Sequence, residues 1–300
     1  MATHTLKNDM FNLVINERGG CIDCFQYRGK KPFDILRPRT ELGNGSAGES
    51  GMFPMIPLVN RVRANHFNWR GKQVVLPINP QVDKGFFLHG DGWLSQWKLS
   101  QENQTDGWIE LELASSIDGV CHYSAVQRFH LIQNRLVVTM TLANQGTEDF
   151  PFGLGFHPFF SCLPDTKVTF PAFGVWLEDH CYLPCSYTTN IPPVFNFNKS
   201  KRIPEDWINN GYSMGEPGVV ATIQHSNGLV ITLTSPCEYL QVFKPKGQSN
   251  FLCLEPQSQA VDAHSYLPTS SDDSATSNMG LVVLSPNQSM QIQMSIQVRK

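Results

Sequence analysis

The sequence contains a histidine and a glutamate in settings suited to acid–base chemistry. His157 lies in the run 152–160, where two glycines allow close backbone approach, Pro158 fixes the following backbone, and aromatic residues on both sides would exclude water. Glu255 ends the apolar run 251–254, where a carboxylate is costly to bury unless it is paired or used. Exclusion of water shifts the pKa of either group, which is how proton donors and acceptors are tuned. The alternatives are a core histidine held by a backbone carbonyl and a glutamate at an exposed strand end.

Two further runs carry side chains that could bind a ligand rich in hydroxyl groups. His89 stands between an apolar run and a Gly-Asp-Gly turn within residues 86–93, and Trp93 at the end of that run could stack on a sugar ring. Arg61, beside Asn60, follows an apolar run, and its guanidinium offers five N–H donors in a fixed geometry. The alternatives are a structural histidine in a hairpin turn and an arginine on the surface.

Several well-known catalytic motifs are absent from the sequence. There is no glycine-rich phosphate loop, no His-Glu-x-x-His and no Gly-x-Ser-x-Gly. The pairs Cys21/Cys24 and Cys181/Cys185, among eight cysteines, could together hold zinc. The residues around Cys21 alternate as in a strand, and scattered core cysteines are the simpler interpretation. We therefore predict no metal, no cofactor and no disulfide framework.

The elements that position these residues are predicted to be strands. Polar and apolar residues alternate with period two in the runs 108–113, 136–142, 229–233 and 290–298. No stretch of a dozen residues shows the apolar spacing of a helix, and 20 Pro and 23 Gly interrupt the chain throughout. The pattern indicates an all-β, antiparallel fold, either a sandwich or a barrel.

Composition limits the classes of protein and of partner. The chain has 300 residues, 41% of them hydrophobic, a net charge of −3 and a pI near 6.3, so nucleic-acid and membrane partners are not expected. No apolar run approaches the roughly 20 residues of a membrane span, and residues 1–7 lack an apolar signal core, so we expect a cytoplasmic protein. No break in composition marks a linker, which predicts one domain over 1–300 with 269–277 as a surface loop.

Taken together and in order, these clusters resemble the aldose 1-epimerase (galactose mutarotase) family, and the resemblance covers nearly the whole chain. The matching runs are 60–61, 88–90, 155–158 and 254–256. The resemblance implies a single large β-sandwich, galactose mutarotase-like, with an open, sugar-sized groove on one sheet.

The resemblance also implies a role for individual residues. His157 corresponds to the general acid and is expected to start protonated, whereas Glu255 corresponds to the general base and is expected to start ionised. The residues expected to bind the sugar are Asn60, Arg61, His89, Asn209 and Gln241. Asn209 departs from the family, which usually has an aspartate there, and an amide lacks the strength of a charge-assisted hydrogen bond.

The function expected from the resemblance is interconversion of the α and β anomers of a free aldohexose, by a monomer or homodimer whose partner is a small sugar. One alternative is a hexose-phosphate 1-epimerase with Arg61 and Arg63 on the phosphate, although the run 88–93 resembles the free-sugar branch more closely. Another is a non-catalytic carbohydrate-binding protein, favoured by the amide at Asn209. A third is a glycoside hydrolase, which needs two carboxylates and would have only Asp262 beside Glu255.

Overall fold

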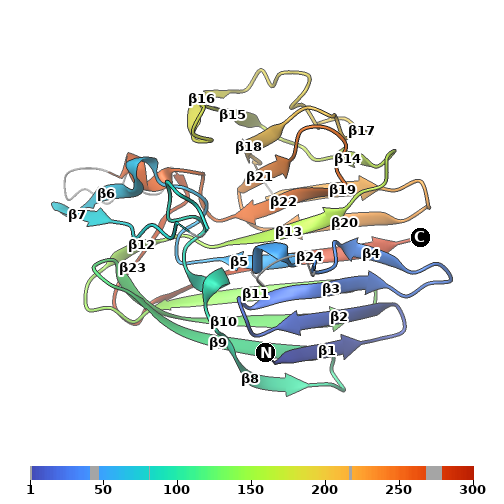
Figure 1. Ribbon diagram of the computed structural model, residues 1–300, viewed down its shortest axis with the longest axis horizontal. Coiled ribbons are helices and arrows are strands. Elements are labelled where there is room, and N and C mark those ends of the chain that lie inside the picture. The colour runs from blue at the N-terminus through green and yellow to red at the C-terminus, as the bar shows by residue number, and fades with distance from the viewer. Residues whose placement is uncertain (1, 41–46, 81, 216–217, 268–278) are drawn as a thin grey trace.

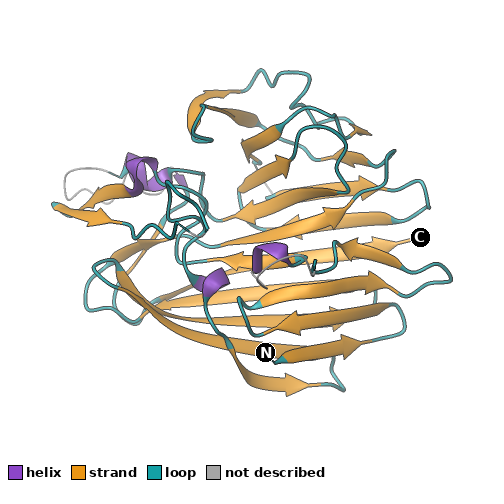
Figure 2. Cartoon of the chain, viewed as in Figure 1, coloured by secondary structure: helices purple, strands orange, loops and turns teal. Residues whose placement is uncertain are grey.

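Antiparallel strands make up most of the computed structural model, which describes residues 2–40, 47–80, 82–215, 218–267 and 279–300 (Figure 1). The predicted surface loop 269–277 lies outside the described residues. The helices described are single 3-10 turns (Figure 2), namely η1 (Ala47–Glu49), η2 (Arg63–Asn65), η3 (Gly92–Leu94) and η4 (Ala263–Tyr266). Within the described ranges, none of these is long or apolar enough to cross a membrane.

The first large sheet carries 11 strands within the described residues. Strands from distant parts of the sequence lie next to one another at its centre, as Figure 1 shows for β13, β22 and β21. The strands, in order, are β1 (Thr3–Lys7), β2 (Phe11–Asn16), β3 (Cys21–Tyr27), β4 (Phe33–Leu36), β13 (Gly155–Ser161), β22 (Phe251–Gln257), β21 (Tyr239–Lys244), β18 (Ile208–Ser213), β15 (Gly174–Glu178) and β16 (Pro184–Thr188), with β5 (Met52–Met55) paired to β13 and β3.

The second large sheet carries nine strands, again counted over the described ranges. All four alternating runs of the sequence fall in this sheet, apart from Leu229, which precedes its strand, so those strand predictions are confirmed. The strands, in order, are β17 (Lys201–Arg202), β14 (Lys167–Thr169), β19 (Val219–Gln224), β20 (Val230–Ser235), β24 (Ser289–Arg299), β11 (Arg135–Asn144), β10 (Cys121–Ile132), β9 (Trp108–Ile117) and β8 (Lys98–Asn103). Two two-stranded sheets complete the set: the hairpin of β6 (His66–Trp69) with β7 (Lys72–Val75), and the pair of β12 (Phe150–Phe152) with the distant β23 (Val282–Leu284).

The hydrophobic core lies between the two large sheets. Phe25 and Leu254 of the first sheet and Phe129, Val138 and Met294 of the second are fully buried members of one apolar cluster. Side chains alternate between the two faces of a strand, so each strand gives every second residue to this core. The predicted antiparallel β-sandwich is therefore confirmed.

The outer face of the first sheet positions the candidate site. On β22, Leu252 and Leu254 belong to the core, so Cys253 and Glu255 project to the opposite face. The segment between β5 and β8, which carries η2, β6, β7 and η3, covers part of that face (Figure 1). A second apolar cluster there includes Phe53, Trp93, Phe159 and Cys253. The sheet thus has a buried outer surface on which polar groups can be shielded from water.

Candidate active site

Strand register brings the candidate residues into one row across the outer face. Gln241 of β21 lies opposite Glu255 of β22 and opposite Gly211 of β18. His157 of β13 lies between two residue pairs that join β13 to β22, which places it beside Glu255. Neighbouring strands are about 4.8 Å apart, so side chains in such a row can contact one another.

His157 and Glu255 form a buried pair. His157 Nε2 lies 3.3 Å from Glu255 Oε1, and the two residues are 7% and 1% exposed. The imidazole lies between the rings of Phe53 and Phe159, with centroid distances of 4.5 Å and 4.6 Å. Gln257 Nε2 donates to Glu255 Oε2 at 3.4 Å. Glu255 is inside β22, so the alternative of a glutamate at an exposed strand end is wrong.

Burial dominates the electrostatics of this pair. It lowers the pKa of His157 to about 3, with a further lowering from the positive charge of Arg37. Burial also raises the pKa of Glu255 well above its usual range, against smaller opposing effects of Gln257 and Arg61. Both shifts disfavour charge, so burial favours neutral imidazole and protonated carboxyl over the ion pair. The expectation of a protonated His157 and an ionised Glu255 concerns the reactive form of the pair and stays a prediction.

Two residues on the covering segment are held in an unusual backbone conformation at the edge of the site. Asn60 and His89 have φ values of 61° and 60°, and His89 N–H donates to the Asn60 carbonyl at 3.0 Å. Gly90 approaches the Ile56 carbonyl so closely that an added Cβ would lie 1.9 Å from its oxygen. Non-glycine residues adopt positive φ only where surrounding contacts compel it, and such strain clusters at functional sites.

An open cleft of about 260 Å³ joins these groups. Of the residues expected from the sequence, six line it, and Gln241 lies beside it. The lining residues are Asn60, Arg61, Leu88, His89, His157, Tyr182, Trp207, Asn209, Phe243 and Glu255. The structure therefore gathers residues that are up to 195 positions apart in the sequence, from Asn60 to Glu255, around one space.

Arg61 is the cation of this cleft. Its Nη1 donates to Asn60 Oδ1 at 3.4 Å, and its Nη2 lies 3.7 Å from Asp83 Oδ2. The alternative of a surface arginine is wrong, since the guanidinium lines the cleft. Arg63 points elsewhere: its three nitrogens donate to Asp262, Asp179 and the Pro184 carbonyl.

A polar chain runs along the wall of the cleft. Gln241 Nε2 donates to Asn209 Oδ1 at 2.9 Å, and Asn209 Nδ2 donates to Glu178 Oε2 at 2.7 Å. Trp207 Nε1 donates to Glu178 Oε1 at 2.6 Å. Sequence reasoning missed Glu178 and Trp207 because neither has a distinctive neighbouring residue, and only the pairing of β15 with β18 brings Glu178 to Asn209.

Trp93 does not reach the cleft, so the expectation that it stacks on a sugar is wrong. It is 6% exposed, its ring is stacked on Phe53 at 4.8 Å, and its Nε1 donates to the carbonyls of Leu88 and Gly90. The aromatic rings that do line the cleft are those of Tyr182, Trp207 and Phe243.

Several buried polar atoms without a partner lie in this site. Among the described residues they include Arg61 Nε, Nδ1 of both His89 and His157, and Gln241 Oε1. Such atoms are rare in folded proteins and are retained where function requires them. Burial, aided by the charges of His157 and Arg61, lowers the pKa of His89 well below its usual value, so this ring is neutral.

The cysteines do not assemble as the zinc hypothesis required. In the described part of the chain, the groups of at least three possible metal ligands are His157–Cys253–Glu255 and Asp179–His180–Cys181. Neither group joins Cys21 or Cys24 to the second cysteine pair. All eight cysteines are free thiols.

Comparison with known proteins identifies the family that this fold and site define. The family model described as aldose 1-epimerase matches residues 2–297. The chain belongs to the aldose 1-epimerase family. It is 35% identical over 306 residues to the uncharacterised protein YphB of Escherichia coli K12, covering 99% of both chains.

Solved structures share the fold. A candidate aldose 1-epimerase from Escherichia coli K12 superposes with a TM-score of 0.88 at 32% identity, with 99% of each chain covered. A galactose mutarotase-like protein from Clostridium acetobutylicum has a TM-score of 0.82 at 17% identity, over 99% of this chain and 94% of its own. The second likeness shows the fold alone, and the predicted galactose mutarotase-like fold is confirmed.

Proposed function

We propose that the protein is an aldose 1-epimerase that interconverts the α and β anomers of a free aldohexose. The observation that carries the proposal is the buried His157–Glu255 pair, 3.3 Å apart, facing a cleft with Arg61 and His89. A pair that holds one proton can remove a proton from one oxygen and deliver another nearby. Ring opening of a cyclic aldose needs those two transfers and no net change in charge.

The reaction begins from the form in which Glu255 is ionised and His157 is protonated. Glu255 accepts the proton of the C1 hydroxyl, C1 becomes a carbonyl as its bond to the ring oxygen breaks, and His157 protonates that oxygen. The open aldehyde turns about the C1–C2 bond, and the same transfers in reverse close the ring on the other face. Each positioned acid or base contributes about 10²–10⁴ in rate.

Burial favours the form of the pair that accompanies the open chain. Opening converts carboxylate and imidazolium into carboxyl and neutral imidazole, and desolvation favours that neutral state. The short distance between Nε2 and Oε1 lets the pair exchange its proton directly, so it returns to the charged form that the ring-opening step requires. Burial therefore lowers the free energy of the neutral pair that ring opening produces relative to the charged pair from which opening starts.

The remaining cleft residues suit a neutral sugar. Arg61 and the neutral imidazole of His89 can donate to sugar oxygens, and Asn60, Asn209 and Gln241 supply amides. For a phosphorylated sugar the cleft offers Arg61, which lies beside Asp83, whereas Arg63 is bound to other groups.

Neither glycoside hydrolysis nor sugar binding without catalysis gains support from the geometry. A glycoside hydrolase would need a second carboxylate within about 10 Å of Glu255. Asp262 is fully buried and bound to Arg63 and Ser265, and Glu178 lies on the third strand from Glu255, about 14 Å away at about 4.8 Å per strand. A protein that only binds sugar has no need of an acid beside a base in a dry site.

Polarimetry of freshly dissolved α-D-galactose and α-D-glucose tests the proposal. We expect the wild type to accelerate the approach to equilibrium, and Glu255→Gln to lower kcat by at least about 100-fold, with a comparable loss in His157→Ala. Glu148→Gln is the matched control, since Glu148 is exposed and paired with Lys72. A folded Glu255→Gln variant with near-normal kcat would refute the assignment of the base. A folded wild type with no effect on either sugar would refute the activity.

A further inference from the structure

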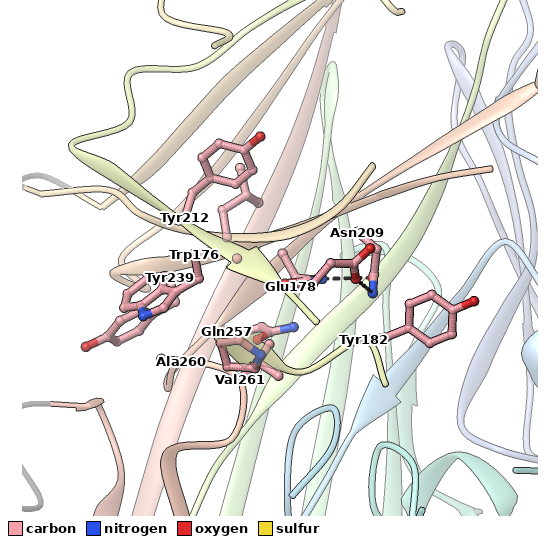
Figure 3. Close-up of a pocket in the computed structure, with 13 residues that line it drawn as sticks. Trp176, Glu178, Tyr182, Asn209, Tyr212, Tyr239, Gln257, Ala260 and Val261 are labelled. Carbon is pink, nitrogen blue, oxygen red and sulfur yellow. Dashed lines mark hydrogen bonds between the residues drawn. The ribbon is translucent and has the colours of Figure 1, made fainter. Parts of the chain in front are cut away.

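Glu178 is a carboxylate at the cleft wall that no part of the proposed mechanism uses. It lies at the end of β15, and its Oε2 accepts from Asn209 Nδ2 at 2.7 Å (Figure 3). Its Oε1 accepts from Trp207 Nε1 at 2.6 Å. It is half-buried, and burial raises its pKa while these two donors lower it. The Glu178 carboxylate is thus partly shielded from water but still accessible to a ligand.

Glu178 fixes the direction in which the side-chain amides of Asn209 and Gln241 donate their hydrogen bonds. A carboxylate only accepts, so Asn209 must present its N–H₂ to Glu178 and its oxygen to Gln241. An ionised carboxylate has about four acceptor positions, and the two described donors use two. The remaining positions are free to accept from a ligand.

Glu178 lies at the junction of two spaces. It lines a narrow pocket of about 20 Å³ that shares Asn209 and Tyr182 with the main cleft (Figure 3). The charge of Arg61 lowers the pKa of both Glu178 and Glu255, so the guanidinium lies close enough to influence both carboxylates. Glu178 lies on β15, the third strand beyond the β22 of Glu255, and contacts the cleft through Asn209 and Trp207.

Glu178 adds a charged acceptor to the neutral amide acceptors of the cleft. Glu255 is occupied by the C1 hydroxyl, and the other charged group lining the cleft, Arg61, only donates. The hydroxyls of a pyranose at C3 and C4, on the side opposite C1, need an acceptor, and a charged acceptor gives a hydrogen bond about twice as strong as a neutral one.

We propose that the Glu178 carboxylate binds the C3 or C4 hydroxyl of the sugar and thereby determines sugar preference. This inference rests on the proposed function for the orientation of the sugar. Glu178 is assigned to substrate binding, whereas His157 and Glu255 carry the proton transfers. Trp207 and Asn209 position the carboxylate.

The first test is Glu178→Gln, measured by polarimetry and by calorimetric titration with D-galactose and D-glucose. We expect KM and Kd to rise about 10- to 100-fold, as for loss of a charged hydrogen bond, with kcat changed less than about threefold. Glu148→Gln is the control. An unchanged KM and Kd in Glu178→Gln would overturn the inference.

Deoxy sugars separate direct contact from a purely structural role. The wild type should bind either 3-deoxy- or 4-deoxy-D-glucose more weakly than D-glucose, and that penalty should vanish in Glu178→Gln, whereas any penalty for 2-deoxy-D-glucose should persist. If every penalty is retained in the variant, Glu178 does not touch the sugar, and the inference fails.

The double variant Glu178→Gln with Asn209→Asp controls for a loss of binding that is due only to disruption of the hydrogen-bond network. Trp207 can still donate to the new side-chain oxygen at 178, the amide there can donate to the carboxylate at 209, and Gln241 can donate as before. The network is thus kept while the charge moves one strand. We expect recovered folding with a changed ratio of 3-deoxy to 4-deoxy binding; full recovery of the wild-type ratio would mean that the network alone matters and would overturn the inference.

Failure of the proposed function is distinguishable from failure of this inference. A wild type that does not accelerate mutarotation refutes the activity, and calorimetry of the wild type and Glu178→Gln then still decides whether Glu178 binds sugar. A wild type that turns over while Glu178→Gln is indistinguishable from it refutes only the inference.

Discussion

The proton shared by His157 and Glu255 links residue-level electrostatics to the proposed chemistry. A dry setting is imposed on the imidazole by Phe53 and Phe159, and on the carboxyl by its place in the middle of β22. Taken alone, each pKa shift moves its group away from the value at which an isolated acid or base works best near neutral pH. Together they keep one proton on the pair over a wide pH range, because the two groups titrate as a unit.

The pH profile follows from these shifts. With the pKa of His157 lowered to about 3 and that of Glu255 raised well above its usual range, the singly protonated pair persists between those limits. We expect the acid limb of kcat/KM to lie well below the ordinary imidazole value near 6.5, and the limb at which Glu255 loses its proton to lie well above the ordinary carboxyl value. Polarimetry with the spontaneous rate subtracted measures this profile.

Arg37 offers a matched variant for the same prediction. Its guanidinium lies 3.6 Å from the centroid of the Phe159 ring, and its charge lowers the pKa of His157. Arg37→Met should raise that pKa and move the acid limb of the profile toward neutral pH. A wild-type limb with a midpoint near 6.5, or one that is unaffected by Arg37→Met, would contradict the shared-proton description.

At the scale of the element, β22 separates stability from chemistry by alternation. Leu254 is fully buried in the core between the sheets, whereas Glu255 faces the cleft. Leu254→Ala should lower the free energy of unfolding by about 2–5 kcal/mol while leaving kcat of the folded protein within about threefold. Urea unfolding and polarimetry of the same samples measure both quantities.

The reverse outcome is expected for the neighbouring position. Glu255→Gln should remove activity with little loss of stability, since it replaces a buried ionisable group by an isosteric amide. A large loss of kcat in folded Leu254→Ala, or a larger loss of stability in Glu255→Gln than in Leu254→Ala, would refute this separation.

Local sequence patterns predicted individual strands better than they predicted which side chains meet. The alternation at 290–298 gave β24, and the distinctive runs around His157 and Glu255 drew attention to both residues. Glu178 and Trp207 carry no such local signal. Their place in the cleft depends on the register of β15 and β18, and register is a tertiary property that one strand's pattern does not specify.

The error at Trp93 has a similar cause. Its neighbours suggested an exposed turn, but its indole N–H donates to carbonyls of the same covering segment, which turns the ring toward Phe53 and away from the cleft. The ends of strand runs were also misleading: Glu255 follows four apolar residues yet continues the strand to Gln257.

At the scale of the whole molecule, the sandwich encloses several neutral histidines. Besides His157 and His89, burial lowers the pKa of His225 and of His264 to about 4. His264 is 1% exposed, and its Nε2 lies 3.0 Å from the Pro151 carbonyl. Each of these histidines gains a proton on unfolding at mildly acidic pH, so each couples global stability to pH.

His264 provides the cleanest measurement of this coupling because it lies away from the cleft. Its pKa is about 4 in the folded chain and about 6.5 when unfolded, so the unfolded state binds the proton first as pH falls. Its contribution to the free energy of unfolding is therefore fully present above pH 6.5 and is lost toward pH 4, by about 1 kcal/mol between pH 7 and pH 5.5.

His264→Gln keeps a donor for Pro151 but cannot titrate. We expect the stability gap between wild type and this variant, measured by urea unfolding, to narrow by that amount at the lower pH. A gap for His264→Gln that is the same at both pH values would refute this prediction, because stability is independent of pH only where the imidazole binds protons equally in the folded and unfolded states.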